Sequence, residues 1–103
     1  MKKAEFYETL KNELSVIFET IKIAKDENNE PFEMIGFTPD NDLSHNTVII
    51  SMIGENNVSV KCLDRNNSVK AHNETNYKGN KENMIPLTIK LANNYKNGVK
   101  SLF

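Results

Sequence analysis

The sequence predicts a single α+β domain in which helices pack on one face of a small antiparallel sheet. Three observations support this prediction. Residues 5–25 place apolar side chains at helical spacing, residues 47–63 are typical of two strands around a short Gly/Asn loop, and residues 83–97 have a helical pattern again. At 103 residues, 38% apolar and 26% charged, the chain suits one core, so the predicted domain spans residues 1–103.

The first segment predicts a long amphipathic helix. Its apolar residues recur at alternating steps of three and four, which places on one helix face Tyr7, Leu10, Leu14, Ile17, Ile21 and Ala24. Residues 26–29 then end the helix. In a rival interpretation the β-branched and aromatic residues 16–23 favour a strand, so the helix ends near Leu14 and a hairpin turns at residues 27–29. The continuous helix is preferred because no Gly or Pro separates Leu14 from Val16.

The middle of the chain predicts a three-stranded antiparallel sheet. Pro31 cannot continue a helix and begins an extended stretch that lasts to residue 38. Residues 39–42 form a turn cluster. Residues 47–53 are the most β-like run, and residues 58–63 alternate with a period of two after a four-residue loop. These two runs predict a hairpin.

Residues 64–83 differ from the rest of the chain. They hold six asparagines, and their apolar content is limited to Val69, Ala71 and Tyr77. A structureless segment of this length is uncommon in a compact domain. The segment is therefore expected to be a mobile or functional loop, or to contain a weak fourth strand around Val69 and Ala71.

The last segment predicts a second helix. Asn83 can serve as its N-cap, Pro86 suits its first turn, and Gly98 places its end near Asn97. Its apolar face consists of Ile85, Ile89, Ala92, Val99 and Leu102. Both helices are expected to cover one sheet face, as a two-layer sandwich. The predicted core contains Leu10, Leu14, Ile17, Ile21, Val48, Ile50, Val60, Cys62, Ile89 and Ala92.

Cysteine usage and hydropathy predict a cytoplasmic protein without a membrane segment. Cys62 is the one cysteine and cannot form an internal disulfide, which is typical of a reducing compartment. Acidic residues interrupt the N-terminal segment, so it does not resemble a signal peptide, and no apolar run approaches the ~18 residues of a membrane-spanning helix. The sixteen Asn, nine Ile and twelve Lys against one Arg suggest AT-rich codons and an origin in a bacterium, a phage or a mobile element.

No residue pattern predicts an enzyme, a cofactor or a metal. The chain holds four residues of types that bind zinc, namely His45, His72, Cys62 and Asp64, but their spacing matches no zinc motif. Cys62 and His72 could act as nucleophile and base. However, Cys62 is in phase with Val58 and Val60 on one side of a strand, so it is expected to be a buried, inert side chain.

The charge distribution predicts a binding protein. Residues 61–103 carry a net charge of +5, whereas residues 1–33 and 34–60 carry −3 each. The candidate binding residues lie in the Asn-rich loop: Arg65, Lys70, Tyr77, Lys78 and Lys81. We expect a small non-enzymatic protein-binding domain, such as an inhibitor, an immunity protein or an adaptor, with Tyr77 as anchor. The alternative is a nucleic-acid-binding accessory protein that uses the basic C-terminal part, although a single arginine argues against specific base recognition.

Overall fold

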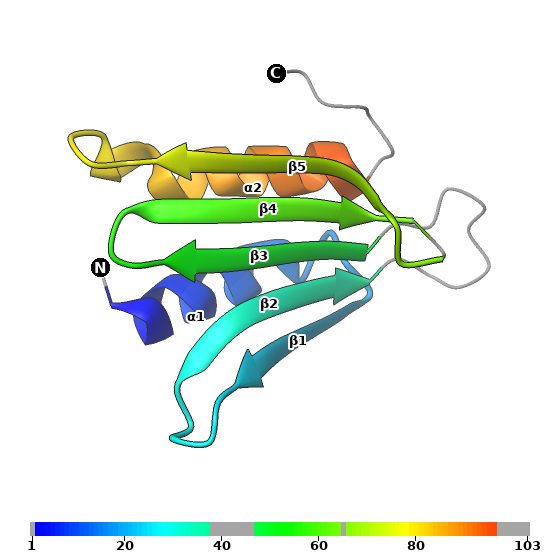
Figure 1. Cartoon of the computed structure of the whole chain (residues 1–103), viewed down its shortest axis with the longest axis horizontal. Coiled ribbons are helices and arrows are strands. Elements are labelled where there is room, and N and C mark those ends of the chain that lie inside the picture. The colour runs from blue at the N-terminus through cyan, green and yellow to red at the C-terminus, as the bar shows by residue number, and fades with distance from the viewer. Residues whose placement is uncertain (1, 38–46, 65, 97–103) are drawn as a thin grey trace.

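Five antiparallel strands form one sheet in which the spatial order of the strands follows the chain, β1-β2-β3-β4-β5. The computed structural model describes residues 2–37, 47–64 and 66–96. In chain order the elements are α1 (Lys3–Leu14), β1 (Thr20–Lys25), β2 (Pro31–Phe37), β3 (Thr47–Ile53), β4 (Asn57–Leu63), β5 (Val69–Asn76), the short 3₁₀ helix η1 (Lys81–Asn83) and α2 (Met84–Lys96). Figure 1 shows both helices behind the sheet, so no described helix covers its other face, which we call the open face.

The predicted class, helix order and layering are confirmed, but the number of strands is wrong. The structure has five strands where three were predicted. The possible fourth strand around Val69 and Ala71 is β5, and the further strand, β1, comes from the segment assigned to the first helix. The predicted β3–β4 hairpin is present, with Gly54 at a positive φ of 68° in its turn. The expected turn at residues 39–42 and the apolar positions Val99 and Leu102 lie outside the described residues.

The long first helix is a wrong prediction, and the rival interpretation is correct. Helix α1 ends at Leu14 and β1 begins at Thr20. The β-branched side chains of residues 16–23 lose rotamer freedom in a helix but pack well on a pleated sheet. Pairing with β2 supplies their backbone groups with partners, so neither Gly nor Pro is needed to end the helix.

The expectation of a mobile loop at residues 64–83 is wrong for the part that forms strand β5 (Val69–Asn76), where the alternative of a further strand is correct. The backbone of β5 pairs with β4 from Asn57↔Asn76 to Leu63↔Val69. A strand at the edge of a sheet can be polar, since only part of its surface faces the core. The ladder to β4 therefore orders a segment that has too little apolar content to pack by itself.

Two hairpin turns share the pattern Asp-x-Asn-Asn and the same geometry. Asp26 Oδ1 accepts hydrogen bonds from the backbone N–H groups two and four residues later, at 2.8 and 3.0 Å. Asp64 Oδ1 does the same, at 2.9 Å in both contacts. The second asparagine of each turn, Asn29 or Asn67, has a φ of 65° or 63°. Asparagine tolerates this left-handed conformation better than most residues do, and the aspartate supplies the missing hydrogen bonds of the turn.

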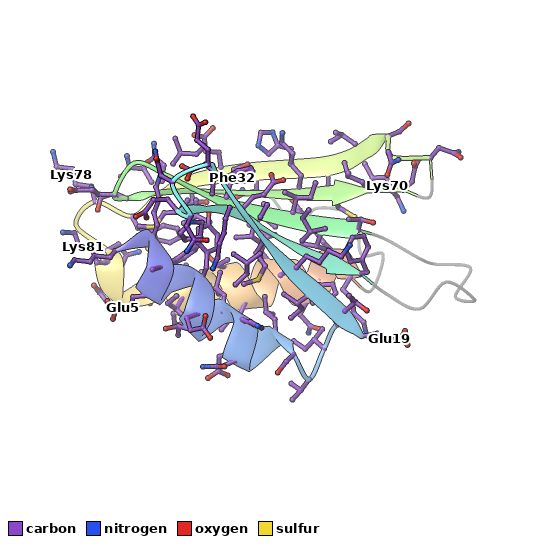
Figure 2. All side chains as sticks on the ribbon, turned by 90° about the horizontal axis from the view of Figure 1, so that it is seen from below. Glu5, Glu19, Phe32, Lys70, Lys78 and Lys81 are labelled. Carbon is purple, nitrogen blue, oxygen red and sulfur yellow. The ribbon has the colours of Figure 1, made fainter. Side chains whose placement is uncertain are left out.

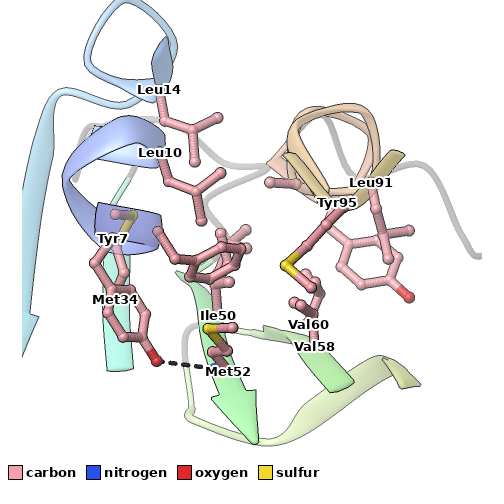
Figure 3. Packing of buried hydrophobic residues seen from close by; sticks show 14 of the residues in the cluster. Tyr7, Leu10, Leu14, Met34, Ile50, Met52, Val58, Val60, Leu91 and Tyr95 are labelled. Carbon is pink, nitrogen blue, oxygen red and sulfur yellow. Dashed lines mark hydrogen bonds between the residues drawn. The ribbon is translucent and has the colours of Figure 1, made fainter. Parts of the chain in front are cut away.

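The core lies between the sheet and the two helices. Figure 3 shows side chains of α1 and α2 meeting the inward side chains of the strands. Of the predicted core, seven residues are buried, namely Leu10, Leu14, Val48, Ile50, Val60, Cys62 and Ala92. The other three, Ile17, Ile21 and Ile89, are half-buried and pack against the cluster.

The Tyr7 side chain links α1 to the sheet at the point where the pairing of β2 with β3 ends. The direct pairing of β2 with β3 extends as far as Met34↔Ile50. Beyond this pair, the Tyr7 hydroxyl donates to the carbonyl of Phe32 and accepts from the N–H of Met52, at 2.8 Å each (Figure 3 marks the Met52 contact). The hydroxyl thus takes the place of a direct strand-to-strand hydrogen bond and satisfies both backbone groups.

Candidate functional site

The structure does not bring the predicted binding residues together. Lys70 lies near the start of β5, whereas Lys78 and Lys81 follow the end of that strand. Figure 2 shows these lysines at opposite ends of the molecule. Eight residues of extended chain span about 26 Å, so neighbours in the sequence become distant in space. Arg65 lies outside the described residues.

Tyr77 is buried, which corrects the expectation of an exposed anchor. Its side chain is 4% exposed and belongs to the core cluster. Its backbone N–H donates to the carbonyl of Asn56 at 2.7 Å, which ties the end of β5 to the β3–β4 turn. The ring is part of the core and offers almost no contact area to a partner.

Cys62 and His72 lie on opposite faces of the sheet. Cys62 pairs with Ala71, and the next residue of β4, Lys61, pairs with His72. Successive residues of a strand point to opposite faces, so the imidazole cannot reach the thiol as a base. Cys62 is buried, and its Sγ donates to the carbonyl of Tyr95 at 3.6 Å. Burial raises the pKa of the Cys62 thiol and Asp64 adds to the rise, while Lys70 opposes it.

The buried thiol yields a prediction about reactivity and pH. We expect Cys62 to react with a thiol reagent slowly in the native protein and fast in denaturant, because its thiolate is rare and enclosed. Since the folded pKa is raised, the native state keeps its proton when the unfolded state loses it. This contribution to stability is complete below the unfolded thiol pKa of about 8.5 and decreases as the pH rises above it. Cys62→Ala is the control for urea unfolding between neutral and alkaline pH. Stoichiometric labelling within seconds without denaturant would contradict the burial.

His72 belongs to the open face and is held against β4. Its Nε2 lies 2.9 Å from the hydroxyl oxygen of Ser59, which is itself 6% exposed. Among the residues that the structure describes, no group of three or more His, Cys, Asp or Glu side chains could hold a metal ion. His45, one of the four candidate zinc ligands, lies outside that part of the chain.

The open face of the sheet has an apolar centre with cationic neighbours. One row across the five strands consists of Lys22, Ile35, Ile49, Lys61 and His72. The adjacent row consists of Thr20, Phe37, Thr47, Leu63 and Val69. We call the apolar members of these rows, Ile35, Phe37, Ile49, Leu63 and Val69, the open-face patch. Its first four residues are half-buried by their neighbours, and Val69 is 58% exposed.

Lysines flank the open-face patch on both sides. The Nζ of Lys22 lies 5.9 Å from the centre of the Phe37 ring, within the range of a cation–π interaction. Lys61 and His72 are exposed on the other side of the patch. The face therefore offers apolar contact area beside Lys22 and Lys61, with Glu33 and Glu74 in the next row of the same face. Neither α1 nor α2 covers it (Figure 1).

The sequence carried a signal for this patch that the first interpretation did not use. Val48, Ile50 and Met52 of β3 face the helices, but Ile49 and Ile53, which alternate with them, are apolar too. A strand at the surface of a two-layer domain normally alternates between apolar and polar residues. The outward positions of β3 are therefore mixed, with Ile49 and Ile53 alternating with Thr47 and Ser51.

The described helices include none that is long and apolar enough to span a membrane. No protein-family model, curated protein or solved structure matches the chain.

Proposed function

We propose that this chain is a small, non-enzymatic protein-binding domain that docks on its partner through the open-face patch. The observation that supports the proposal is the row in which Ile35 and Ile49 lie between Lys22 and Lys61, on a sheet face that neither described α-helix covers. An apolar centre inside a polar rim is the usual anatomy of a protein interface. Contiguous apolar area on a small soluble domain marks interaction sites.

The charge around the patch indicates the partner's chemistry. Lys22 and Lys61 would meet acidic groups on the partner, which raises the association rate more than the affinity. This role fits a cytoplasmic inhibitor, immunity protein or adaptor, and the codon usage inferred from the composition favours a bacterium, a phage or a mobile element as the source. The apolar centre supplies the affinity, because its burial releases water from Ile35 and Ile49.

A pair of matched substitutions tests the docking face. Ile49→Lys places a charge in the open-face patch, and Leu87→Lys makes the same kind of change at a 41%-exposed position of α2. A photoreactive amino acid in place of Lys61 should form crosslinks to the partner protein, and these crosslinks should survive nuclease treatment. The same amino acid in place of Lys90 on α2 should form none. Ile49→Lys should abolish the crosslink at unchanged thermal stability, and Leu87→Lys should preserve it. Equal crosslinking at positions 61 and 90 would contradict the proposal.

Nucleic-acid binding remains the second candidate function, and one observation favours it. Lys22 and Lys61 lie on the open face with Phe37, and sheet faces that carry cations and aromatic rings bind single strands. Binding of this kind weakens steeply with salt. If nucleic acid binds to the open face, Lys22→Glu combined with Lys61→Glu should abolish the binding. If it binds to the basic C-terminal part, the triple change of Lys70, Lys78 and Lys81 to Glu should abolish it instead. Failure to retard single- or double-stranded probes at low salt would exclude this function.

A further inference from the structure

We propose that the free edge of β1 binds an extended acidic peptide, which adds to the sheet as a sixth strand. The site lies at the sheet edge beside α1 and is separate from the open-face patch. It concerns the mode of recognition and the chemistry of a peptide ligand, and it does not require the open face to be a docking surface.

The backbone of β1 supplies the first part of the argument. In the described sheet, β1 pairs with β2 on one side and is the terminal strand on the other. Every second residue of Thr20–Lys25 therefore directs its N–H and C=O groups away from the sheet. Unpaired groups at a sheet edge form hydrogen bonds with any extended chain that lies alongside, and pockets for alternate side chains then select among such chains.

A cleft beneath β1 supplies the pocket. Helix α1 packs on β2 and on α2, and Figure 1 shows β1 at the sheet edge next to β2. Ile21 and Ile23, which point toward the helix layer, remain half-buried. Between α1 and the β1–β2 hairpin lies a cleft of about 490 Å³, whose lining includes Tyr7, Glu8, Lys11, Ile23, Lys25 and Pro31. An added strand would send alternate side chains into this cleft, where apolar ones would cover Ile23.

The N-terminal third of the chain has a net charge of −3, but the charges on β1 itself and in the cleft lining favour an acidic strand. Lys22 lies on the open-face side of β1, while Lys25 and Lys11 line the cleft together with one acid, Glu8. Opposite charges on neighbouring strands stabilise a pair, and like charges destabilise it. A second copy of β1 would bring lysines against lysines, so self-pairing is disfavoured. The register shift between Ala24 and Lys25 further restricts indiscriminate pairing. In a strand that alternates apolar and acidic residues, the apolar side chains would lie in the cleft and the carboxylates would pair with the lysines.

The other edge of the sheet lacks these features. The residues of β5 that point toward the helix layer are Ala71, Asn73 and Thr75, which are small or polar. The Thr75 hydroxyl already donates to Asn73 Oδ1 at 2.7 Å. A strand added beside β5 would bury little apolar surface, so only its backbone hydrogen bonds would stabilise its binding.

Synthetic peptides test the edge site on the full-length chain. The first is a ten-residue peptide that alternates valine with glutamate, and the second has lysine in place of each glutamate. A third keeps the glutamates but carries two prolines, which remove N–H donors. In ¹H–¹⁵N spectra we expect the first peptide to shift the amides of Thr20–Lys25 saturably and to slow their hydrogen exchange. It should bind at least about ten-fold tighter than the lysine peptide, since two or three cross-strand charge pairs differ. The proline peptide should not bind.

Two variants separate the outcomes. Lys22→Glu with Lys25→Glu should reverse the preference between the glutamate and lysine peptides, while Ile49→Lys should leave peptide binding unchanged because it alters only the open face. Equal affinity for both charged peptides would overturn the proposal, and so would shifts centred on Ile35, Ile49 and Lys61. Absence of saturable shifts with every peptide would also overturn it. None of these results bears on the crosslinking at Lys61, so the two proposals fail independently.

Discussion

Replacing Phe18 by alanine is expected to lower the free energy of unfolding by about 3–5 kcal/mol. Phe18 is 3% exposed and lies in the connection between α1 and β1. Its ring covers Gly36 of β2 so closely that a Cβ on this glycine would stand 2.8 Å from the ring Cγ. The ring therefore occupies the space that the glycine leaves empty, and its removal would open a cavity over bare backbone.

A double-mutant cycle isolates this contact. Gly36→Ala alone should cost about 1–3 kcal/mol, because the new Cβ overlaps the ring and forces Phe18 to move. In the Phe18→Ala background the same change should cost much less, so the two effects are not additive. Urea unfolding of the four proteins measures the coupling, and Val16→Ala, at a position that is 88% exposed in the same connection, is the control. Additive losses would show that the ring does not rest on Gly36.

Leu14→Ala should destabilise the protein by about 2–5 kcal/mol. Leu14 is 1% exposed at the end of α1 and packs in the cluster that Figure 3 shows. Its carbonyl also accepts from the N–H groups of Ile17 and Phe18 at 2.9 and 3.0 Å, so it lies where the chain leaves the helix. Truncation would create a cavity at the junction of helix and sheet. The matched control is the exposed neighbour Glu13→Ala, and a loss for Leu14→Ala below about half a kcal/mol would place this residue outside the core.

The fold class followed from periodicity, but the boundary between α1 and β1 did not. Residues 7–24 satisfy the helical spacing throughout, because Ile21 and Ala24 fill positions of the helix face and can equally lie in a strand. The spacing of apolar residues cannot decide between a helix and a strand when pairing with β2, which is distant in the sequence from α1, stabilises the strand. The Asp-x-Asn-Asn pattern at residues 26–29 and 64–67 was the available signal. It marks two hairpin turns and therefore two strand pairs that a search for glycine and proline misses.

The candidate site was harder to predict than the fold, for a geometric reason. A cluster of basic residues in a sequence remains a cluster on a helix or in a compact loop, but a strand separates its members by about 3.3 Å per residue. Lys70 and Lys78 are distant for this reason, and the last apolar residue of the segment, Tyr77, is buried in the core. The open-face patch assembles residues from four different strands, so only the register of the whole sheet reveals it.

The order of the strands has a consequence for how fast the chain folds. Because each strand pairs with the one before it, every ladder closes a short loop, and the entropic cost of closure is small. Chains dominated by such local contacts fold faster than sandwiches with crossed connections, and single hairpins form in about 1–10 μs. The hydrogen bond from the Met52 N–H to the Tyr7 hydroxyl joins the sheet to α1 across 45 residues of chain. We therefore expect the meander to form early and the docking of α1 to limit the folding rate.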